Sequence, residues 1–189
     1  MAPSLVISGT VASGKSTLAR VLAERFSYRH LSTGDLFKAM AAERKMTTVA
    51  FLELCKKEKK IHYNLDQRML AQLAEGDTVA DGKLLVWLAP PACFTIFLDA
   101  GEQIRAERIA DHDRVSIEHS LAALRDREKK ERESFSAAYP DLDLTDYTHG
   151  DLVLDSSSCS TEQLVAQVLV AYEEKYGLVL EMKTRRTTL

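Results

Sequence analysis

The chain has 189 residues, of which 46% are hydrophobic and 28% charged, a composition typical of a soluble globular protein and unlike that of a fibrous or disordered one. This length suits one well-packed domain and is short for two. A net charge of -3 provides no overall positive field for a nucleic-acid backbone, so the expected ligand is small. The three cysteines are far apart in the sequence and form no C-x-x-C pair, so neither a disulfide framework nor a zinc site is predicted.

Neither a targeting segment nor a membrane span is predicted. The first residues carry no basic region. The longest apolar segment, residues 84–98, is interrupted by two prolines and is shorter than the ~20 residues that span a bilayer. We therefore expect a cytoplasmic monomer with neither a membrane nor a nucleic-acid partner.

The first predicted element is a short buried strand at residues 5–7, which a glycine-rich loop follows directly. Apolar residues at helical spacing begin after this loop, at Leu18. The loop fits the pattern G-x-x-x-x-G-K-[ST] at every specified position, and it consists of Gly9, Thr10, Val11, Ala12, Ser13, Gly14, Lys15 and Ser16. Glycines let such a backbone curl so that its N–H groups point inward, and the following helix adds the positive end of its dipole. We expect this phosphate loop, residues 9–16, to bind a triphosphate.

Three side chains at the end of the phosphate loop have predicted roles. Lys15 would reach the β- and γ-phosphates as a point charge, and the Ser16 hydroxyl would be one ligand of a Mg²⁺ ion on the same oxygens. Thr17 is a second residue at the start of the helix. The alternative, a glycine-rich turn that matches by chance, is disfavoured because five specified positions lie between a strand and a helix.

A second short strand is predicted at residues 28–31, and small polar residues follow it. Ser32 and Asp35 are three apart, which is the spacing of a capping box at a helix start. They could also touch an acceptor substrate, because this loop leaves the sheet on the same side as the phosphate loop. Both interpretations can hold together.

Two helical patterns occupy much of residues 47–75. Some forty residues of helix between two strands are more than one right-handed crossover needs. We therefore expect part of this stretch to form a helical flap that closes on substrate. The next strand, residues 78–81, ends in Asp81, which could hold Mg²⁺ directly or through water or could simply begin an Asp-Gly turn.

The strand at residues 94–98 is followed by a helix from Glu102 that places Arg105 and Arg108 on one face. A further helix begins at Ser116, and its continuation, residues 125–133, contains no apolar residue. One interpretation is an exposed helix with many ion pairs. The favoured one is a mobile lid whose arginines close over the phosphates, because a guanidinium fork can hold a phosphoryl group in two places.

The last predicted strand is at residues 152–154, and Ser160 with Gln163 predicts a capping box at the start of the final helix. Five short strands that alternate with helices predict a parallel sheet covered on both faces. Ligands bind beyond the carboxyl ends of such strands, so the loops at 9–16, 32–35 and 81–83 should form one site.

Taken together, these motifs resemble the cytidylate kinase family, especially its short archaeal type. The likeness covers nearly the whole chain and is carried by the phosphate loop with Thr17, by Ser32 to Phe37, by Asp81-Gly82, by Arg105 to Arg108, by the arginine-rich segment and by Asp151 to Asp155. It implies a P-loop NTPase fold, a three-layer α/β/α domain with a five-stranded parallel sheet, spanning residues 1–177. Its expected parts are a core (1–33, 77–111 and 150–177), a helical insert that binds a nucleoside monophosphate (about 34–76), a lid (about 112–138) and a tail (178–189).

The resemblance implies an ATP- and Mg²⁺-dependent kinase that moves the γ-phosphoryl group of ATP to CMP or dCMP, by direct transfer without a covalent intermediate. Lys15 with Arg125 and Arg132 would then be catalytic, and the phosphate loop with Thr17, Arg105 and Arg108 would bind ATP. Ser16 and Asp81 would hold the metal. The acceptor would be bound by Ser32, Asp35, Lys38, Asp81, Gly82, Lys83 and Arg127.

Two departures from the family pattern leave the acceptor open. The family usually has arginine where this chain has Lys38 and Lys83, and lysine lacks the planar fork. An adenylate-kinase-like enzyme and a kinase of a small non-nucleotide metabolite therefore remain alternatives. A nucleotide-hydrolysing switch is the alternative from another class, and it would release phosphate without any acceptor.

Overall fold

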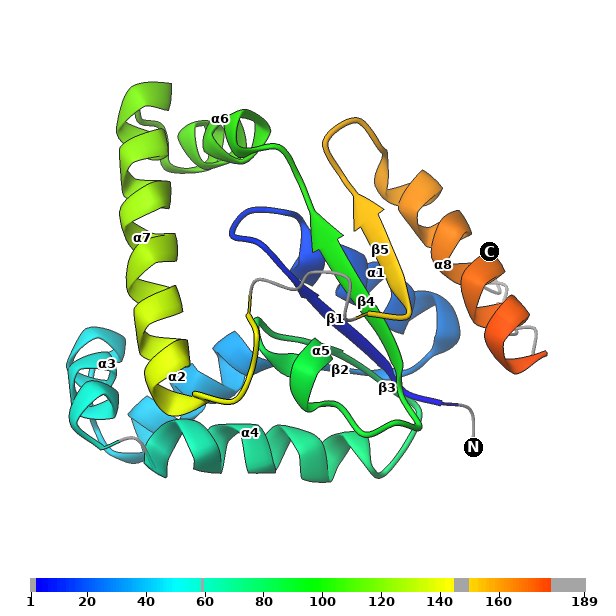
Figure 1. Cartoon of the computed structure of the whole chain (residues 1–189), viewed down its shortest axis with the longest axis horizontal. Coiled ribbons are helices and arrows are strands. Elements are labelled where there is room, and N and C mark those ends of the chain that lie inside the picture. Colours follow the sequence, from blue (N-terminus) through cyan, green and yellow to red (C-terminus); the bar gives the residue numbers. More distant parts are fainter. Residues whose placement is uncertain (1–2, 59, 145–149, 178–189) are drawn as a thin grey trace, which may run out of the picture.

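Five parallel strands form a single sheet in the order β2-β3-β1-β4-β5 in the computed structural model, which describes residues 3–58, 60–144 and 150–177 (Figure 1). The predicted tail, residues 178–189, lies outside the described residues. The expected number and direction of strands are confirmed. The strands are β1 (Leu5–Gly9), β2 (Arg29–Ser32), β3 (Thr78–Asp81), β4 (Phe94–Asp99) and β5 (Leu152–Asp155).

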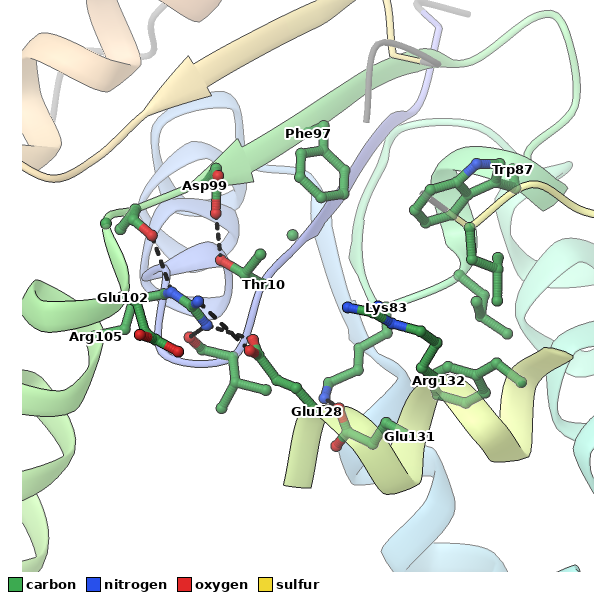
Figure 2. A pocket seen from close by; sticks show the side chains of 17 residues that line it. Thr10, Lys83, Trp87, Phe97, Asp99, Glu102, Arg105, Glu128, Glu131 and Arg132 are labelled. Carbon is green, nitrogen blue, oxygen red and sulfur yellow. Dashed lines mark hydrogen bonds and ion pairs between the residues drawn. The ribbon is translucent and has the colours of Figure 1, made fainter. Parts of the chain in front are cut away.

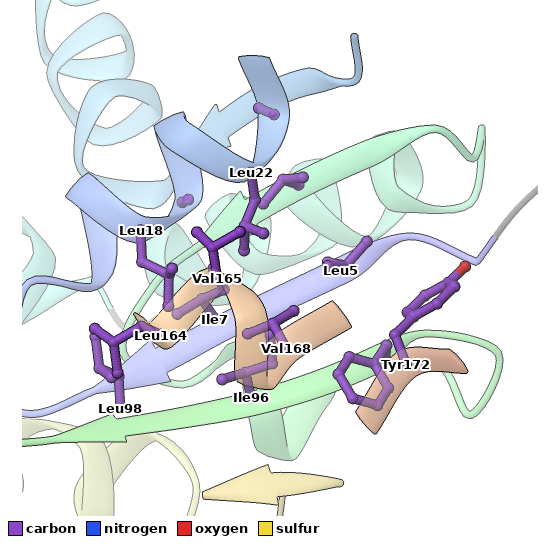
Figure 3. Packing of buried hydrophobic residues seen from close by; sticks show 14 of the residues in the cluster. Leu5, Ile7, Leu18, Leu22, Ile96, Leu98, Leu164, Val165, Val168 and Tyr172 are labelled. Carbon is purple, nitrogen blue, oxygen red and sulfur yellow. The ribbon is translucent and has the colours of Figure 1, made fainter. Parts of the chain in front are cut away.

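Two helices cover one face of the sheet, α1 (Lys15–Phe26) and α8 (Thr161–Tyr176). Leu5 and Ile7 of β1 point to this face, where they pack with Leu18 and Leu22 of α1 and Val168 of α8 (Figure 3). The alternation along β1 follows from the strand's period of two residues. This face contains the main hydrophobic core, which Tyr172 closes at one end.

The opposite face of the sheet is covered by α4 (Lys60–Leu73) and the short α5 (Leu85–Leu88). Val6 of β1 points to this side and packs with Met69 of α4 and Leu85 of α5. Helices therefore cover both faces, as predicted. The loops at the carboxyl ends of the strands are left to form a site.

The segment between β2 and β3 contains three helices, α2 (Thr33–Glu43), α3 (Thr48–Lys57) and α4, in agreement with the helical patterns expected there. They have a small core of their own, in which Met40, Phe51 and Leu65 are buried. At its other end α4 packs on the sheet, so these helices are joined to it through one shared helix.

Two further helices, α6 (Glu102–Asp113) and α7 (Ile117–Ala138), follow β4. The long α7 runs from α6 to the vicinity of α2 and α4 (Figure 1). Near its first end Leu124 packs on Val11 of the phosphate loop, and just past its last residue the Tyr139 hydroxyl donates a hydrogen bond to the buried Asp66 carboxylate of α4. One helix therefore connects the loop to the α2–α4 segment.

The two predicted capping boxes have different outcomes. Ser160 and Gln163 form one at the start of α8, as expected. The prediction of a capping box at the start of α2 is wrong, because the Ser32 side chain makes no cap hydrogen bond and Asp35 pairs instead with Lys38. Ser32 is the last residue of β2, where its backbone is paired with Asp81 of β3. No helix of the described residues is long and apolar enough to cross a membrane.

Candidate active site

The phosphate loop connects β1 to α1 and lies against the end of β4. A Cβ atom on Gly9 would be 2.0 Å from the Leu98 carbonyl oxygen, so only glycine allows this close approach. The Thr10 amide donates to the same carbonyl at 3.3 Å, and the Thr10 hydroxyl donates to Asp99 at 2.8 Å. The loop is thereby fixed to the neighbouring strand.

Donors from outside the loop bind its carbonyl oxygens. Arg105 donates to the Val11 carbonyl at 3.3 Å, and Arg108 donates to the Ala12 carbonyl at 3.1 Å. The Ser156 hydroxyl, after β5, donates to the Ser13 carbonyl at 2.7 Å. Arg105 and Arg108 therefore share one face of α6, as their spacing predicted. Because its carbonyl oxygens accept these hydrogen bonds, the loop is held in one conformation.

Lys15 lies within the loop and is half-buried. Its ammonium group donates to the Thr10 carbonyl at 3.3 Å. Burial lowers the pKa of Lys15, and the nearby Arg127 and Arg105 lower it further. Asp81 acts in the opposite direction. A bound phosphate would compensate the repulsion among these cations, so the charges around Lys15 favour an anion at this position.

The structure brings Ser16 and Asp81 together from distant parts of the chain. The Ser16 hydroxyl donates to one Asp81 carboxylate oxygen at 2.7 Å, and His30 of β2 lies 2.7 Å from the other. Asp81 ends β3, which lies between β1 and β2, so the sheet itself creates this meeting. A hydroxyl and a carboxylate are hard oxygen ligands of the kind that Mg²⁺ accepts. His30 was not among the predicted site residues, because the pairing of β2 with β3 that brings it to Asp81 has no signal in the sequence.

A cavity of about 380 Å³ lies beside the phosphate loop, between the loop, the end of β4, α5 and α7 (Figure 2). Its polar lining includes Thr10 and Asp99 on one side and Lys83 and Arg132 on the other. The remaining lining residues are Gly9, Val11, Leu84, Trp87, Phe97, Ala100, Gly101, Glu102, Arg105, Glu128, Glu131, Phe135 and Leu144.

Two glutamates of α7 pair with cations of this cavity. Glu128 binds the guanidinium of Arg105, which is 7% exposed, and Glu131 pairs with the ammonium group of Lys83 (Figure 2). Neither glutamate was predicted as a site residue. Their three-residue spacing places them on one side of a helix, but their partners lie on other elements and no pattern along the chain could reveal them.

Lys83 is the most strongly perturbed of these cations. Burial, followed by the charges of Arg127 and Lys15, lowers the pKa of Lys83 to about 6, against the attraction of Glu128. An anion in the cavity would favour the charged form of Lys83, as its pair with Glu131 does.

The predicted lid arginines take different positions on α7. Arg132 lines the cavity, and Arg127 donates to Glu131 at 2.9 Å, beside Lys83. Arg125 forms a two-point ion pair with Glu102 on α6. With a further pair between Lys130 and Asp126, α7 also shows the ion-paired surface that was the alternative interpretation. The ion-paired surface is therefore observed, and the closing of a lid over the phosphates stays a prediction.

The predicted acceptor residues are not all brought together. Lys83 lines the cavity, and Gly82 lies against α2, where a Cβ atom would be 2.1 Å from the Thr33 hydroxyl. Ser32, Asp35 and Lys38 lie at the start of α2, and Lys38 pairs with Asp35 on the surface. They are outside the set of residues that line the cavity.

Comparisons with known proteins agree with this geometry. A model of the cytidylate kinase-like family matches residues 5–158. The cytidylate kinase of Pyrococcus abyssi is 31% identical over 175 residues, which cover 93% of this chain and 96% of that protein. The cytidylate kinase of Halorubrum lacusprofundi is 36% identical over 175 residues, covering 91% and 90%.

Solved structures show the same fold at lower identity. A shikimate kinase from Acinetobacter baumannii has a TM-score of 0.59 at 16% identity and covers 93% of this chain and 96% of its own. A gluconokinase from Sinorhizobium meliloti has a TM-score of 0.60 at 16% identity, covering 93% and 94%. The P-loop kinase fold is thereby established. The family model and the two archaeal relatives extend over most of the sequence, and the chain therefore belongs to the cytidylate kinase-like family.

Proposed function

We propose that this protein is an ATP-dependent kinase that transfers the γ-phosphoryl group of ATP to CMP or dCMP. The observation that carries the proposal is the phosphate loop with its half-buried Lys15, beside a cavity lined by further cations. A phosphoryl acceptor in that cavity would be next to the terminal phosphate of a nucleotide held by the loop. Membership of the cytidylate kinase-like family supports the choice of a cytidine nucleotide as acceptor.

The proposed mechanism is in-line transfer in which the protein positions two nucleotides and stabilises charge. Loop amides and Lys15 would hold the phosphates of ATP, with Arg105 and Arg108 keeping the loop in shape. Ser16 and Asp81 would hold Mg²⁺, which supplies positive charge at the phosphate oxygens. Arg132 and Lys83 would neutralise the charge that develops between donor and acceptor.

The proposed domain organisation follows from the same roles. The sheet with α1, α5, α6 and α8 would be the core, the α2–α4 segment would be the insert that closes over the acceptor and helps to hold it, and α7 would be the lid. Lys38 is paired with Asp35 on the surface and would have to leave this pair to reach the acceptor. Closure of the insert is the kind of motion that completes such sites.

The test is a panel of CMP, dCMP, UMP, AMP and GMP, each with ATP and Mg²⁺, in which ADP formation is measured. We expect CMP or dCMP to give the highest kcat/KM. AMP as the best acceptor would support an adenylate-kinase-like enzyme instead. ADP formed at the same rate without any acceptor would support a nucleotide-hydrolysing switch and would overturn the proposal.

A paired variant, Lys38→Arg with Lys83→Arg, tests whether the two lysines alter acceptor choice. Arginine provides two parallel hydrogen bonds where lysine provides a point charge. We expect the pair to lower the KM for CMP and to leave the KM for ATP unchanged. An unchanged KM for CMP would mean that neither position contacts the acceptor.

A further inference from the structure

The cavity beside the phosphate loop has two chemically different ends. The end at the loop is polar, with the loop backbone, Thr10, Asp99 and Arg105. The other end combines the cations Lys83 and Arg132 with aromatic and aliphatic side chains, which are those of Leu84, Trp87, Phe97, Phe135 and Leu144. A ligand that fits both would have an anionic group joined to a flat apolar one.

Trp87 is held in a fixed orientation at this aromatic end. It lies on α5 and packs edge to face on Phe97 of β4, with ring centroids 5.9 Å apart and an angle of 75° between the planes. Phe97 is 2% exposed and serves as support, whereas Trp87 is only half-buried and lines the cavity. In Figure 2 the indole of Trp87 lies on the same side of the cavity as Lys83 and Arg132. An aromatic ring fixed by another is a suitable surface for stacking.

Phe135 contributes a second aromatic side chain from α7. It is three residues after Arg132, so the two lie on one side of the helix, and both line the cavity. The aromatic end is thus bounded by one element that is fixed to the sheet, α5, and by one that the proposed lid motion would move, α7. Closure of α7 would bring Phe135 toward whatever lies on Trp87.

We propose that Trp87 and Phe135 form the subsite for the heterocyclic base of the phosphate acceptor, with Lys83 placed to meet that acceptor's phosphate. This inference rests on the proposed kinase function and specifies how its acceptor is held. Lys83, Glu131 and Arg132 supply the charges at this end of the cavity, and the rest of its lining is aromatic or aliphatic, which suits a flat heterocycle better than a polyhydroxylated acceptor. A nucleobase offers two flat faces that stack well on such rings.

The subsite has a definite consequence for specificity. Stacking depends little on which base is present, because every base has a π-face. Trp87 and Phe135 therefore distinguish a nucleotide from a base-free sugar phosphate, and they contribute little to the choice between cytosine and uracil. Selection among bases would be made by hydrogen-bonding groups elsewhere.

The chain contains a single tryptophan, so the emission of the unmodified protein reports on Trp87 alone. We expect CMP to produce a saturable change in this emission. Ribose 5-phosphate and inorganic tripolyphosphate should produce none, because they lack a base. If tripolyphosphate or ribose 5-phosphate gives the same change as CMP, or if a non-hydrolysable ATP analogue changes the emission and CMP does not, the acceptor-base subsite is wrong.

Variants test the same proposal through kinetics. Trp87→Ala should raise the KM for CMP about 10- to 100-fold, which is the usual range for the loss of one stacked base contact, and should leave the KM for ATP within about 3-fold. Trp87→Phe keeps a ring and should raise the KM for CMP about 3-fold or less. Val170→Ala, at a 57% exposed apolar residue of α8 outside the cavity lining, is the control and should change neither constant.

Phe135→Ala provides an independent test that keeps the fluorescent reporter and does not depend on the folding of Trp87→Ala. It should weaken the binding of CMP, measured by Trp87 emission, about 10-fold. If CMP is phosphorylated and both alanine variants keep the wild-type KM for CMP, the subsite fails while the kinase function stands. If no nucleoside monophosphate is phosphorylated in the panel, the kinase function fails first.

Discussion

The two sides of the candidate active site are built in different ways. The phosphate loop, residues 9–16, is a continuous segment whose carbonyls are bound by Arg105, Arg108 and Ser156. The opposite side, the α7 wall, consists of the side chains of Glu128, Glu131, Arg132 and Phe135. One side is a backbone structure, and the other is a set of long side chains on a single helix.

The two sides therefore have different roles in substrate binding. Preorganised backbone groups lose little entropy when they bind a phosphate, and no single side-chain substitution removes them. Side chains on α7 can change partners, because Arg105 and Lys83 can donate to a phosphate as well as to a carboxylate. We infer that the loop backbone supplies a fixed contribution to nucleotide affinity. The glutamates of the α7 wall determine how readily Arg105 and Lys83 exchange a carboxylate partner for a substrate phosphate.

The largest expected effect comes from Lys15→Ala, which removes the one long cationic side chain of the loop. Turnover should fall by about 10³-fold, because a positioned charge at the transferring group is lost. Stability should not fall, because the pKa of Lys15 is lowered by burial and its charge is costly in the folded state. An ADP-coupled assay and thermal unfolding measure the two effects.

The exposed Lys129 on α7 is the matched control for this change, and Lys129→Ala should keep both activity and melting temperature. Near-normal turnover of Lys15→Ala would contradict the role of the loop and with it the proposed function.

Gly9→Ala tests whether the loop depends on its close approach to β4. The added Cβ atom would lie 2.0 Å from the Leu98 carbonyl oxygen, which is backbone and cannot turn away. We expect a loss of about 1–3 kcal/mol in the free energy of unfolding, as for other overpacked sites. The melting temperature should fall by about 3–10 °C, and the loop should bind tripolyphosphate more weakly.

Gly34→Ala is the control for this variant, because its Cβ atom would meet only the Ser32 hydroxyl at 3.6 Å and alanine favours the helix. Equal melting temperatures for the two variants would show that the contact with Leu98 is not required.

Glu128→Gln sharpens the comparison on the side of the α7 wall. Glutamine keeps the shape but removes the charge that pairs with Arg105, so a phosphate no longer competes with a carboxylate for the guanidinium. The affinity for tripolyphosphate, measured by calorimetry, should rise about 3- to 10-fold. Glu133→Gln on the exposed side of the same helix should leave it unchanged. Weaker binding by Glu128→Gln would mean that Glu128 supports the site and does not compete for it.

The smallest expected effect is a pH dependence at the far end of α7. Burial raises the pKa of the Asp66 carboxyl above its usual value near 3.8, although the hydrogen bond from Tyr139 and the charge of His62 oppose the rise. The folded protein therefore holds a proton on Asp66 at pH values where the unfolded chain has lost it. This contribution to stability is fully present below the usual pKa and is lost as the pH rises through the raised one.

Asp66→Asn should remove this pH-dependent contribution to stability. Its free energy of unfolding relative to the wild type should therefore increase as the pH rises from about 4 toward neutrality. Burial lowers the pKa of His62, and the charge of Asp66 opposes this. Asp66→Asn removes that opposition and lowers the His62 pKa further, which changes the difference between the two proteins in the same direction. Urea unfolding at several pH values measures the difference. Asp111→Asn, at an exposed position on α6, should have a free energy of unfolding that depends on pH in the same way as that of the wild type. The same pH dependence for Asp66→Asn and the wild type would contradict the raised pKa.

Much of the fold could be predicted because its signals are local. The strands were indicated by short apolar runs, the loop by its glycines and Lys15, and the start of α8 by Ser160 and Gln163. The spacing of Arg105 and Arg108 also predicted that they act together, and both reach the loop. The cap at Ser32 failed because its position at the end of β2 is determined by pairing with β3, which the local pattern does not contain.

The sequence by itself determined the phosphate loop, the alternation of strands and helices, and the family, because each depends on residues that are close together in the chain. Only the tertiary structure decided that His30 and Ser16 meet at Asp81, that Glu128 and Glu131 pair with Arg105 and Lys83, and that Trp87 faces a cavity. These contacts join segments tens of residues apart. Their partners are chosen by the order of the strands and the course of α7, neither of which has a local signal in the amino-acid pattern.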